Sequence, residues 1–162
     1  RWLYEESFRT PLLVQYPGHI KPGTRVEALV QNIDYAPTFL EYAGLAITSN
    51  IQGRSLARVA KGRPQPEWRD SVYYHYYEYP DSHRVAAHYG VRSDRYKLIR
   101  FYEPFDYWEF YDLETDPNEM RNRIDDPAYR DRIAEMKAEL VRLRREYRDD
   151  TGPAIVRTAA RS

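Results

Sequence analysis

The stretch around His88 has the clearest capacity for chemistry in this sequence. His88, Gly90 and Arg92 follow one another at two-residue steps, so in an extended strand the three share one face, while Tyr89 and Val91 share the other. That face presents an imidazole, a gap beside the glycine and a cation. The pattern fits a site for an anion or for sugar hydroxyls, and a solvent-facing sheet edge would show it equally well.

The other candidate residues for chemistry carry weaker patterns. His83 lies in the loop Pro80-Asp81-Ser82-His83, which can reach a ligand or simply face water. His75 stands among tyrosines, where a packed or surface imidazole explains it. No two histidines have the spacing of a metal-binding helix, and the sequence has no cysteine, which excludes disulfides, thiolate metal sites and cysteine nucleophiles within these residues. We therefore expect no metal site from this chain alone.

The composition restricts the partners of the chain. Its formal net charge is zero, which removes the usual electrostatic reason to expect nucleic acid or an anionic membrane. No apolar run approaches the ~20 residues that a membrane helix needs. A chain that begins Arg-Trp, without Met, is expected to be an internal piece of a longer protein, so its lack of targeting signals assigns no localisation.

Residues 1–62 are typical of α/β structure. The run Leu12-Leu13-Val14 predicts a short buried strand. Asp34 to Gly44 predicts a helix that Asp34 or Asn32 caps. The apolar stripe of that helix is Phe39, Leu40 and Ala43. Gly53-Arg54-Ser55-Leu56 opens a predicted helical turn, and the proline-containing residues 63–70 form the predicted linker.

Residues 71–150 are predicted to form an antiparallel sheet covered by one helix. The predicted strands are 71–79, 87–92, 96–102 and 107–113. A tight turn at Ser93-Asp94 joins the second and third strands as a hairpin. Asp126-Pro127 starts a long helix, because a capping carboxylate precedes a proline. Its apolar positions recur at steps of three and four: Ile133, Met136, Leu140, Leu143 and Tyr147. Residues 151–162 lack periodicity and are expected to be a loose tail.

Several segments together resemble the sulfatase family, whose catalytic domain has the alkaline-phosphatase-like fold. In chain order they are Trp2 to Ser7 with Arg9 to Leu12, Asn32 to Asp34 with Pro37-Thr38 and Ala43-Gly44, Gly53 to Leu56, His88 to Arg92 with Asp94 to Ile99, and Tyr111 to Leu113 with Asp116-Pro117 and Glu119. Each motif is weak alone, but their common order from Trp2 to Asp149 is specific. The resemblance implies that residues 1–62 are the C-terminal end of the α/β catalytic domain and that a C-terminal subdomain follows.

The same resemblance implies which catalytic parts are missing. In the family, a cysteine or serine in a Cys-x-Pro-x-Arg motif becomes formylglycine, which attacks sulfur. In the family, that motif, the Asp and Asn ligands of a calcium ion and a sulfate-binding lysine all lie upstream of the matching segments. The resemblance implies that the lysine is expected immediately before Arg1. Calcium and formylglycine are therefore expected in the complete enzyme and not from these residues.

The resulting functional expectation is the C-terminal fragment of a sulfatase acting on sulfated sugars or glycosaminoglycans. It would form part of the substrate pocket with the upstream catalytic domain and be inactive alone. By the resemblance, His88 is the first residue expected to touch a sugar substrate, and His83 is the second. Two alternatives stay open: a stand-alone glycan-binding module, and the C-terminal part of a related phosphoesterase or phosphonate hydrolase.

Overall fold

The computed structural model describes residues 1–63, 65–81 and 83–155. The chain forms two compact units, one of Arg1–Thr10 with Tyr73–Ser162 and one of Pro11–Val72. The division differs from the expected boundaries at the N-terminus, because residues 1–10 pack with the sheet instead of with residues 11–62.

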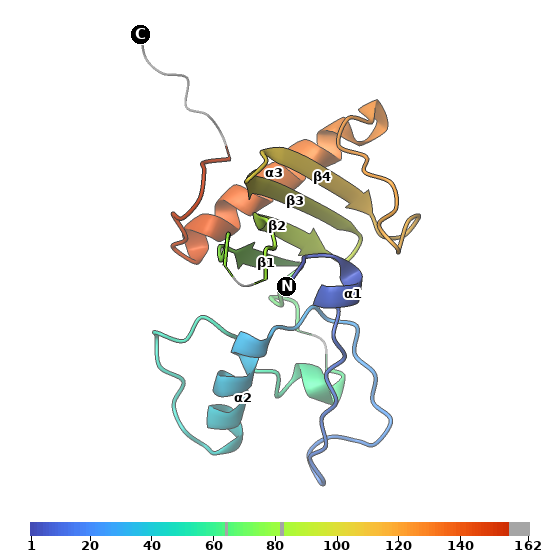
Figure 1. The fold of residues 1–162 in the computed structure, drawn as a ribbon. Helices are drawn as coiled ribbons and strands as arrows, with labels where there is room; N and C mark the ends of the chain where they lie inside the picture. The colour runs from blue at the N-terminus through green and yellow to red at the C-terminus, as the bar shows by residue number, and fades with distance from the viewer. Residues whose placement is uncertain (64, 82, 156–162) are drawn as a thin grey trace. The chain divides into compact units, whose positions relative to one another are not determined.

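The first unit is built on a four-stranded sheet in the order β1-β2-β3-β4 (Figure 1). Its strands are β1 (Ser71–Tyr76), β2 (Ala87–Ser93), β3 (Tyr96–Glu103) and β4 (Tyr107–Asp112). The register places Gly90 of β2 opposite Ile99 of β3, and Ile99 opposite Glu109 of β4, with antiparallel pairing at both steps. The predicted antiparallel sheet is confirmed, including the tight turn between β2 and β3.

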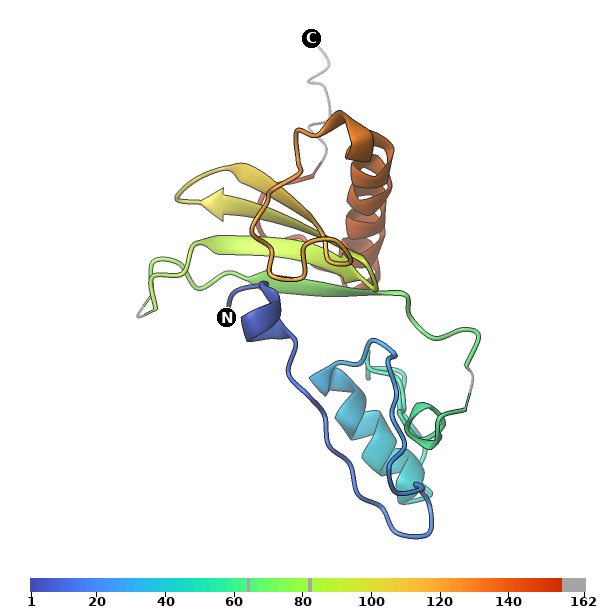
Figure 2. The ribbon, with the colours of Figure 1, turned by 90° about the vertical axis from the view of Figure 1, so that its right-hand side faces the viewer.

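Helix α3 (Arg130–Glu146) covers one face of this sheet (Figure 2). Its buried positions include Ile133, Met136, Leu140 and Leu143, which form one core cluster with the strand residues Tyr89, Val91, Leu98 and Phe110. The helix is preceded by a 3₁₀ turn, Pro127–Tyr129, where the Asp126 side chain accepts a hydrogen bond from the amide of Ala128. The predicted helix, its cap and its apolar stripe are therefore confirmed. Positions three and four residues apart lie on one side of a helix, which is why the spacing predicted the buried face.

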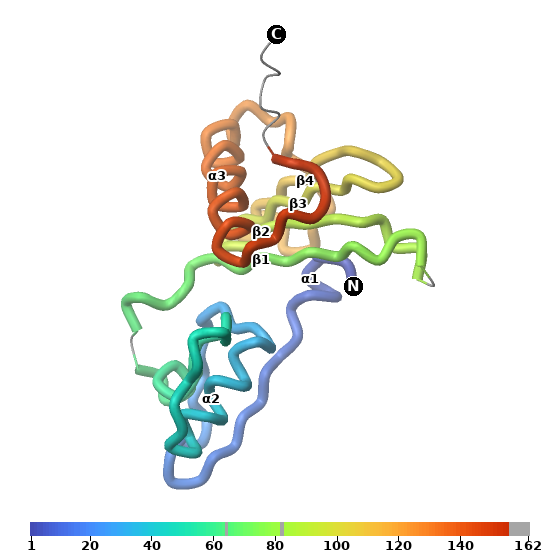
Figure 3. The backbone as a smooth tube through the Cα atoms, turned by 90° about the vertical axis from the view of Figure 1, so that its left-hand side faces the viewer, coloured from blue at the N-terminus to red at the C-terminus, as the bar shows by residue number. Residues whose placement is uncertain are grey.

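The N-terminal residues cover the opposite face of the sheet. The short helix α1 (Glu5–Phe8) and α3 lie on opposite sides of the strands (Figures 2 and 3). Leu3 forms a second core cluster with Ile99, Phe101 and Tyr111, which alternate with the residues that face α3. Both faces of the sheet are thus buried by elements of the same unit, and the tyrosine-rich strands serve mainly as core.

The segment after α3 turns back onto the unit (Figure 3). The buried Arg144 guanidinium donates to the carbonyl of Pro153 at 2.9 Å and to that of Thr151. Tyr89 Oη donates to the Pro153 carbonyl at 2.8 Å, and Arg100 donates to the Ala154 carbonyl at 2.6 Å. Residues 151–155 are therefore held by hydrogen bonds and are not loose. Their backbone carbonyls accept these bonds, and such contacts leave no periodic side-chain pattern in the sequence. Residues 156–162 of the expected tail lie outside the described residues.

Asp34 organises the second unit, just before helix α2 (Tyr35–Tyr42). Its fully buried carboxylate accepts hydrogen bonds from the amides of Gln31 and Arg54, both at 2.8 Å, and from the guanidinium of Arg69 at 2.7 Å. A Cβ on Gly53 would lie 1.9 Å from the Ile33 carbonyl oxygen. The segments around Asp34 and Gly53 thus interlock, and only glycine permits that close approach.

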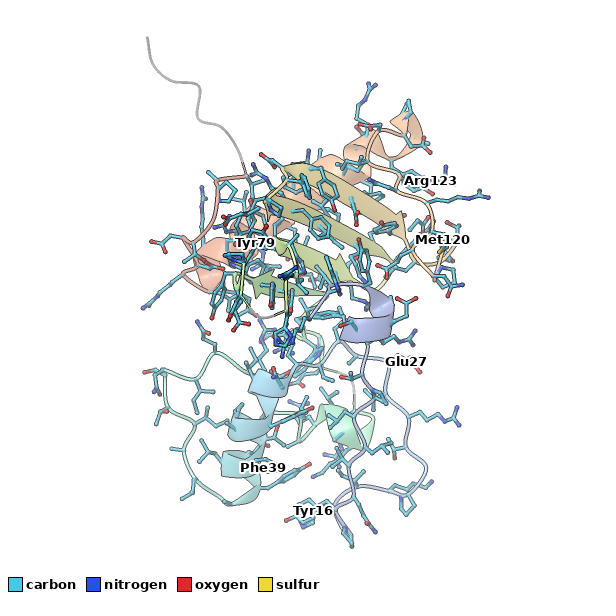
Figure 4. The ribbon with its side chains drawn as sticks, in the orientation of Figure 1. Tyr16, Glu27, Phe39, Tyr79, Met120 and Arg123 are labelled. Atoms are coloured by element: carbon cyan, nitrogen blue, oxygen red, sulfur yellow. The ribbon has the colours of Figure 1, made fainter. Side chains whose placement is uncertain are left out.

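Two expectations for this unit are wrong. The buried residues of α2 are Pro37 and Thr38, whereas Phe39 is 69% exposed (Figure 4). Leu12 to Val14 form no strand, and Leu13 is 91% exposed. A strand needs a neighbouring strand for its backbone hydrogen bonds, and the described part of residues 11–72 contributes only the start of β1.

Candidate functional site

His88 lies within an aromatic box on the α1 side of the sheet. Its side chain is fully buried. Trp2 and Tyr76 stack on the imidazole, with ring centroids 5.7 and 5.8 Å away and interplanar angles of 18° and 28°. Phe101, at 5.0 Å, and Tyr74, at 5.6 Å, are tilted against it. Strand alternation explains the box, since Tyr74 and Tyr76 of β1 and Phe101 of β3 point to the same face as His88.

The hydrogen bonds of His88 fix its tautomer. Nδ1 lies 2.7 Å from the Ala86 carbonyl oxygen, and because a carbonyl can only accept, Nδ1 must carry the proton. Burial lowers the pKa of His88 from 6.5 to about 4, although the bond to Ala86 acts in the opposite direction. The ring is therefore neutral near pH 7, and Nε2 is a pure acceptor. That nitrogen is buried and has no hydrogen-bond partner among the described residues.

The expected gap beside Gly90 does not exist. A Cβ at this position would lie 2.4 Å from Leu3 Cδ2 and 2.5 Å from the Leu98 carbonyl oxygen. Arg92 is occupied as well, because its Nε and Nη2 lie 3.2 and 3.3 Å from the carboxylate of Glu5. Strand β2 also lies inside the sheet, between β1 and β3. The face around His88 is thus neither an open anion site nor a sheet edge, since residues 3–5 dock on it.

A buried ion cluster fastens this docked segment. Lys97 is fully buried, and its Nζ lies 2.7 Å from Glu5 Oε1 and 2.6 Å from Glu119 Oε1. Burial alone would raise the pKa of Glu5, but hydrogen bonds from Arg92 and Lys97 lower it overall. One step earlier, Tyr4 Oη donates to Glu109 Oε2 at 2.8 Å. Sequence reasoning missed this cluster because its members come from separate elements and show no local spacing.

His75 belongs to a different network, on the α3 side of the sheet. Its Nδ1 lies 2.6 Å from Asp149 Oδ2, and its Nε2 lies 2.7 Å from Tyr102 Oη. Asp149 also accepts from Tyr73 Oη at 2.6 Å. Burial would raise the pKa of Asp149, yet the hydrogen bonds from Thr151, Tyr73 and His75 lower it strongly. Both nitrogens of His75 are used inside the fold, so the packed-imidazole interpretation is confirmed.

His83 is an exposed residue in the loop between β1 and β2. The ring contacts and hydrogen bonds that the structure gives for His88 do not include His83. The structure therefore does not join the two sequence-predicted site residues in one described contact. Trp2 and Tyr74, by contrast, are residues of this site that the strand spacing around His88 could not indicate.

The described residues bring together no group of three His, Cys, Asp or Glu side chains that could hold a metal ion. Within the same described ranges, no helix has the length and apolar character needed to cross a membrane.

Comparison with known proteins identifies the family. Residues 1–146 match the family described as N-sulphoglucosamine sulphohydrolase, C-terminal. The chain belongs to this sulfatase family. It is 43% identical over 152 residues to an N-acetylglucosamine-6-O-sulfatase of Bacteroides thetaiotaomicron, covering 93% of the chain and 27% of that protein.

Solved structures of related hydrolases share the fold of this chain. A sulfatase-family structure in complex with its substrate D-glucosamine-2-N,6-O-disulfate superposes with a TM-score of 0.90 at 42% identity, covering 93% of the chain and 31% of that protein. A phosphonate monoester hydrolase of Silicibacter pomeroyi superposes with a TM-score of 0.68 at 28% identity, over 81% of the chain and 28% of that protein. The sulfatase-family chain therefore spans about a third or less of these relatives and corresponds to their C-terminal portion.

Proposed function

We propose that this chain is the C-terminal part of a sulfatase that removes the 6-O-sulfate from glucosamine or N-acetylglucosamine. The observation that carries the proposal is the 43% identity to an N-acetylglucosamine-6-O-sulfatase over 93% of the chain. The similar structure bound to D-glucosamine-2-N,6-O-disulfate supports the same sugar class. Within such an enzyme, this chain forms one wall of the substrate pocket.

His88 is the proposed sugar contact on that wall. Its Nδ1 proton is committed to the Ala86 carbonyl, and its Nε2 is a buried acceptor with no described partner. Leaving a buried acceptor unpaired costs about 1–3 kcal/mol. A sugar hydroxyl can donate to Nε2 and remove that cost, whereas a substrate without hydroxyls cannot. His88 thereby selects for the sugar without touching the reacting sulfate, and His83, exposed on its loop, is proposed as a second contact.

The reactive groups of the proposed enzyme come from the remainder of the protein. A formylglycine supplies the nucleophile in this family, and a calcium ion supplies positive charge at the sulfate. The sequence has no cysteine, and the described residues form no metal-ligand group. By the family resemblance, the chain alone is proposed to bind and orient the sugar, with hydrolysis requiring the upstream catalytic domain.

The alternatives are less well supported. The phosphonate hydrolase interpretation rests on 28% identity, against 42% for the sulfatase complex. A stand-alone glycan-binding module would need an open aromatic surface. Here α3 and residues 2–8 pack on the two faces of the sheet, although Tyr77 is 69% exposed.

Sulfate release by the complete protein tests the proposal. Purified protein with its upstream part should release inorganic sulfate from N-acetylglucosamine 6-sulfate and from glucosamine 6-sulfate. Matched controls are the corresponding 3-O-sulfate and an aryl phosphonate monoester. Faster turnover of the phosphonate, or equal turnover of the two sulfate positions, would overturn the assignment.

A further inference from the structure

We propose that Trp2 is a further substrate-contacting residue beside His88 and His83, and that its indole closes the aromatic box over His88 and stacks on the ring of the sugar. This inference rests on the proposed function and names the residue that admits the sugar to Nε2. The ligand is a pyranose ring that carries a hydroxyl donor beside an apolar C–H face.

Trp2 is the most exposed ring of the aromatic box. Its side chain is 37% exposed, whereas Tyr76 is 6% exposed and Phe101 is fully buried. The remaining ring, Tyr74, is half-buried and is held by a hydrogen bond from its hydroxyl to the Arg1 carbonyl at 2.8 Å. A ligand that approaches His88 from solvent therefore meets Trp2 first.

The indole plane of Trp2 is nearly parallel to the direction in which the lone pair of His88 Nε2 points. The lone pair of Nε2 lies in the imidazole plane, and the indole plane is within 18° of that plane. Stacked rings touch at about 3.5–4 Å, so centroids 5.7 Å apart belong to an offset pair. A sugar whose hydroxyl donates to Nε2 in the imidazole plane can place its ring parallel to the indole. Its C–H face can then pack on the indole as the imidazole does.

Access to Nε2 requires one ring of the box to move. The nitrogen is enclosed, yet the proposed function needs a hydroxyl to reach it. The backbone next to Trp2 is fixed, because Leu3 fills the space at Gly90 and Tyr4 is bonded to Glu109. No hydrogen bond of the Trp2 indole is found among the described residues. A shift of the indole within its own plane, on a fixed backbone, therefore opens the box at least cost and keeps the ring parallel to the imidazole.

Two substrates separate the contact of Trp2 from that of His88. In the complete protein, Trp2→Ala should raise KM for N-acetylglucosamine 6-sulfate by roughly two- to tenfold, the scale of one stacking contact. It should also weaken use of an aryl sulfate, because an aryl ring stacks on the indole too. His88→Ala should affect the sugar far more than the aryl sulfate, because an aryl sulfate has no hydroxyl for Nε2. Trp2→Phe should recover most of the loss, and Trp108→Phe, in a half-buried ring on the α3 side, should leave both KM values unchanged.

The outcomes distinguish the two proposals. Suppose that Trp2→Ala weakens use of the sugar sulfate alone and adds nothing to the loss of His88→Ala in the double variant. Trp2 then only holds the imidazole in position, and this inference is overturned. Unchanged KM values in Trp2→Ala overturn it as well. If His88→Ala is neutral while Trp2→Ala weakens both substrates, the role of His88 fails and that of Trp2 stands. Absence of any sulfate release by the unaltered protein overturns the proposed function, and this inference with it.

Discussion

Leu3 occupies the space that Gly90 leaves open. The leucine is almost completely buried, and its Cδ2 would lie 2.4 Å from a Cβ on residue 90. The glycine thus lets an N-terminal side chain pack directly on the backbone of β2. This contact fixes the position of Trp2, and therefore the environment of His88.

Gly90→Ala should destabilise the chain by about 1–3 kcal/mol, the usual cost of overpacking. The new methyl group would collide with Leu3 and also lie 2.5 Å from the Leu98 carbonyl oxygen. Urea unfolding of the purified chain measures the loss. Adding Leu3→Ala should not rescue the variant, because the carbonyl is part of the neighbouring strand and cannot be trimmed. A Gly90→Ala chain as stable as the parent would show that the packing is looser than described.

Leu140→Ala should cost about 2–5 kcal/mol of unfolding free energy, because this side chain is fully buried between α3 and the sheet. Arg142→Ala, on the exposed side of the same helix, should change it by no more than roughly 0.5 kcal/mol, since its pairs with Glu139 and Glu146 are solvent-screened. Denaturant titration compares the two. Equal effects would mean that α3 is not docked on the sheet.

Stability should fall as pH decreases from above 6.5 toward 4. The folded pKa of His88 is about 4, below its ordinary value near 6.5. In that interval the unfolded chain binds a proton that the folded chain excludes, so acid favours unfolding. The contribution of His88 is at most about 3 kcal/mol. A His88→Phe variant should lose less stability between pH 7.5 and 4.5 than the parent, and identical pH profiles would refute the burial effect.

The chain without its upstream part should not hydrolyse an aryl sulfate, with or without added calcium. Its sequence has no cysteine and no serine in the Cys-x-Pro-x-Arg setting from which the family makes formylglycine, and its described residues supply no metal-ligand group. Turnover is compared with a heat-treated sample of the same preparation, and calorimetry should detect no specific heat of calcium binding. Activity above that control would place catalytic groups within these residues.

The sequence predicted those parts of the fold whose side chains repeat locally. Helix α3 followed from its apolar spacing, and the β2–β3 hairpin followed from its turn. The wrong predictions have a common cause. A local sequence pattern does not show which distant segment a residue packs against. Leu12 to Val14 are apolar enough for a buried strand, but the described residues give them no strand to pair with. Residues 151–155 lack any pattern and are nevertheless held, because Arg144 bonds to their carbonyls.

The sequence predicted which side chains share one face of β2, but not what covers that face. Strand alternation put His88, Gly90 and Arg92 on one face, and the structure keeps them there. The sequence could not show that residues 3–5 dock on that face, since this contact joins distant segments of the chain. The physical consequence is a change of role: Gly90 admits Leu3 instead of a ligand, and Arg92 pairs with Glu5.

In the proposed enzyme, Nε2 of His88 accepts a hydrogen bond from the sugar. The most direct measurement is kcat/KM of the complete protein and its His88→Ala variant on two substrates, N-acetylglucosamine 6-sulfate and an aryl sulfate. We predict a loss of ~10-fold or more on the sugar sulfate, equivalent to ~1.4 kcal/mol or more for one shielded polar contact, and a far smaller loss on the aryl sulfate. Equal losses on both substrates, accompanied by a lower melting temperature, would contradict the claim and leave His88 a structural residue.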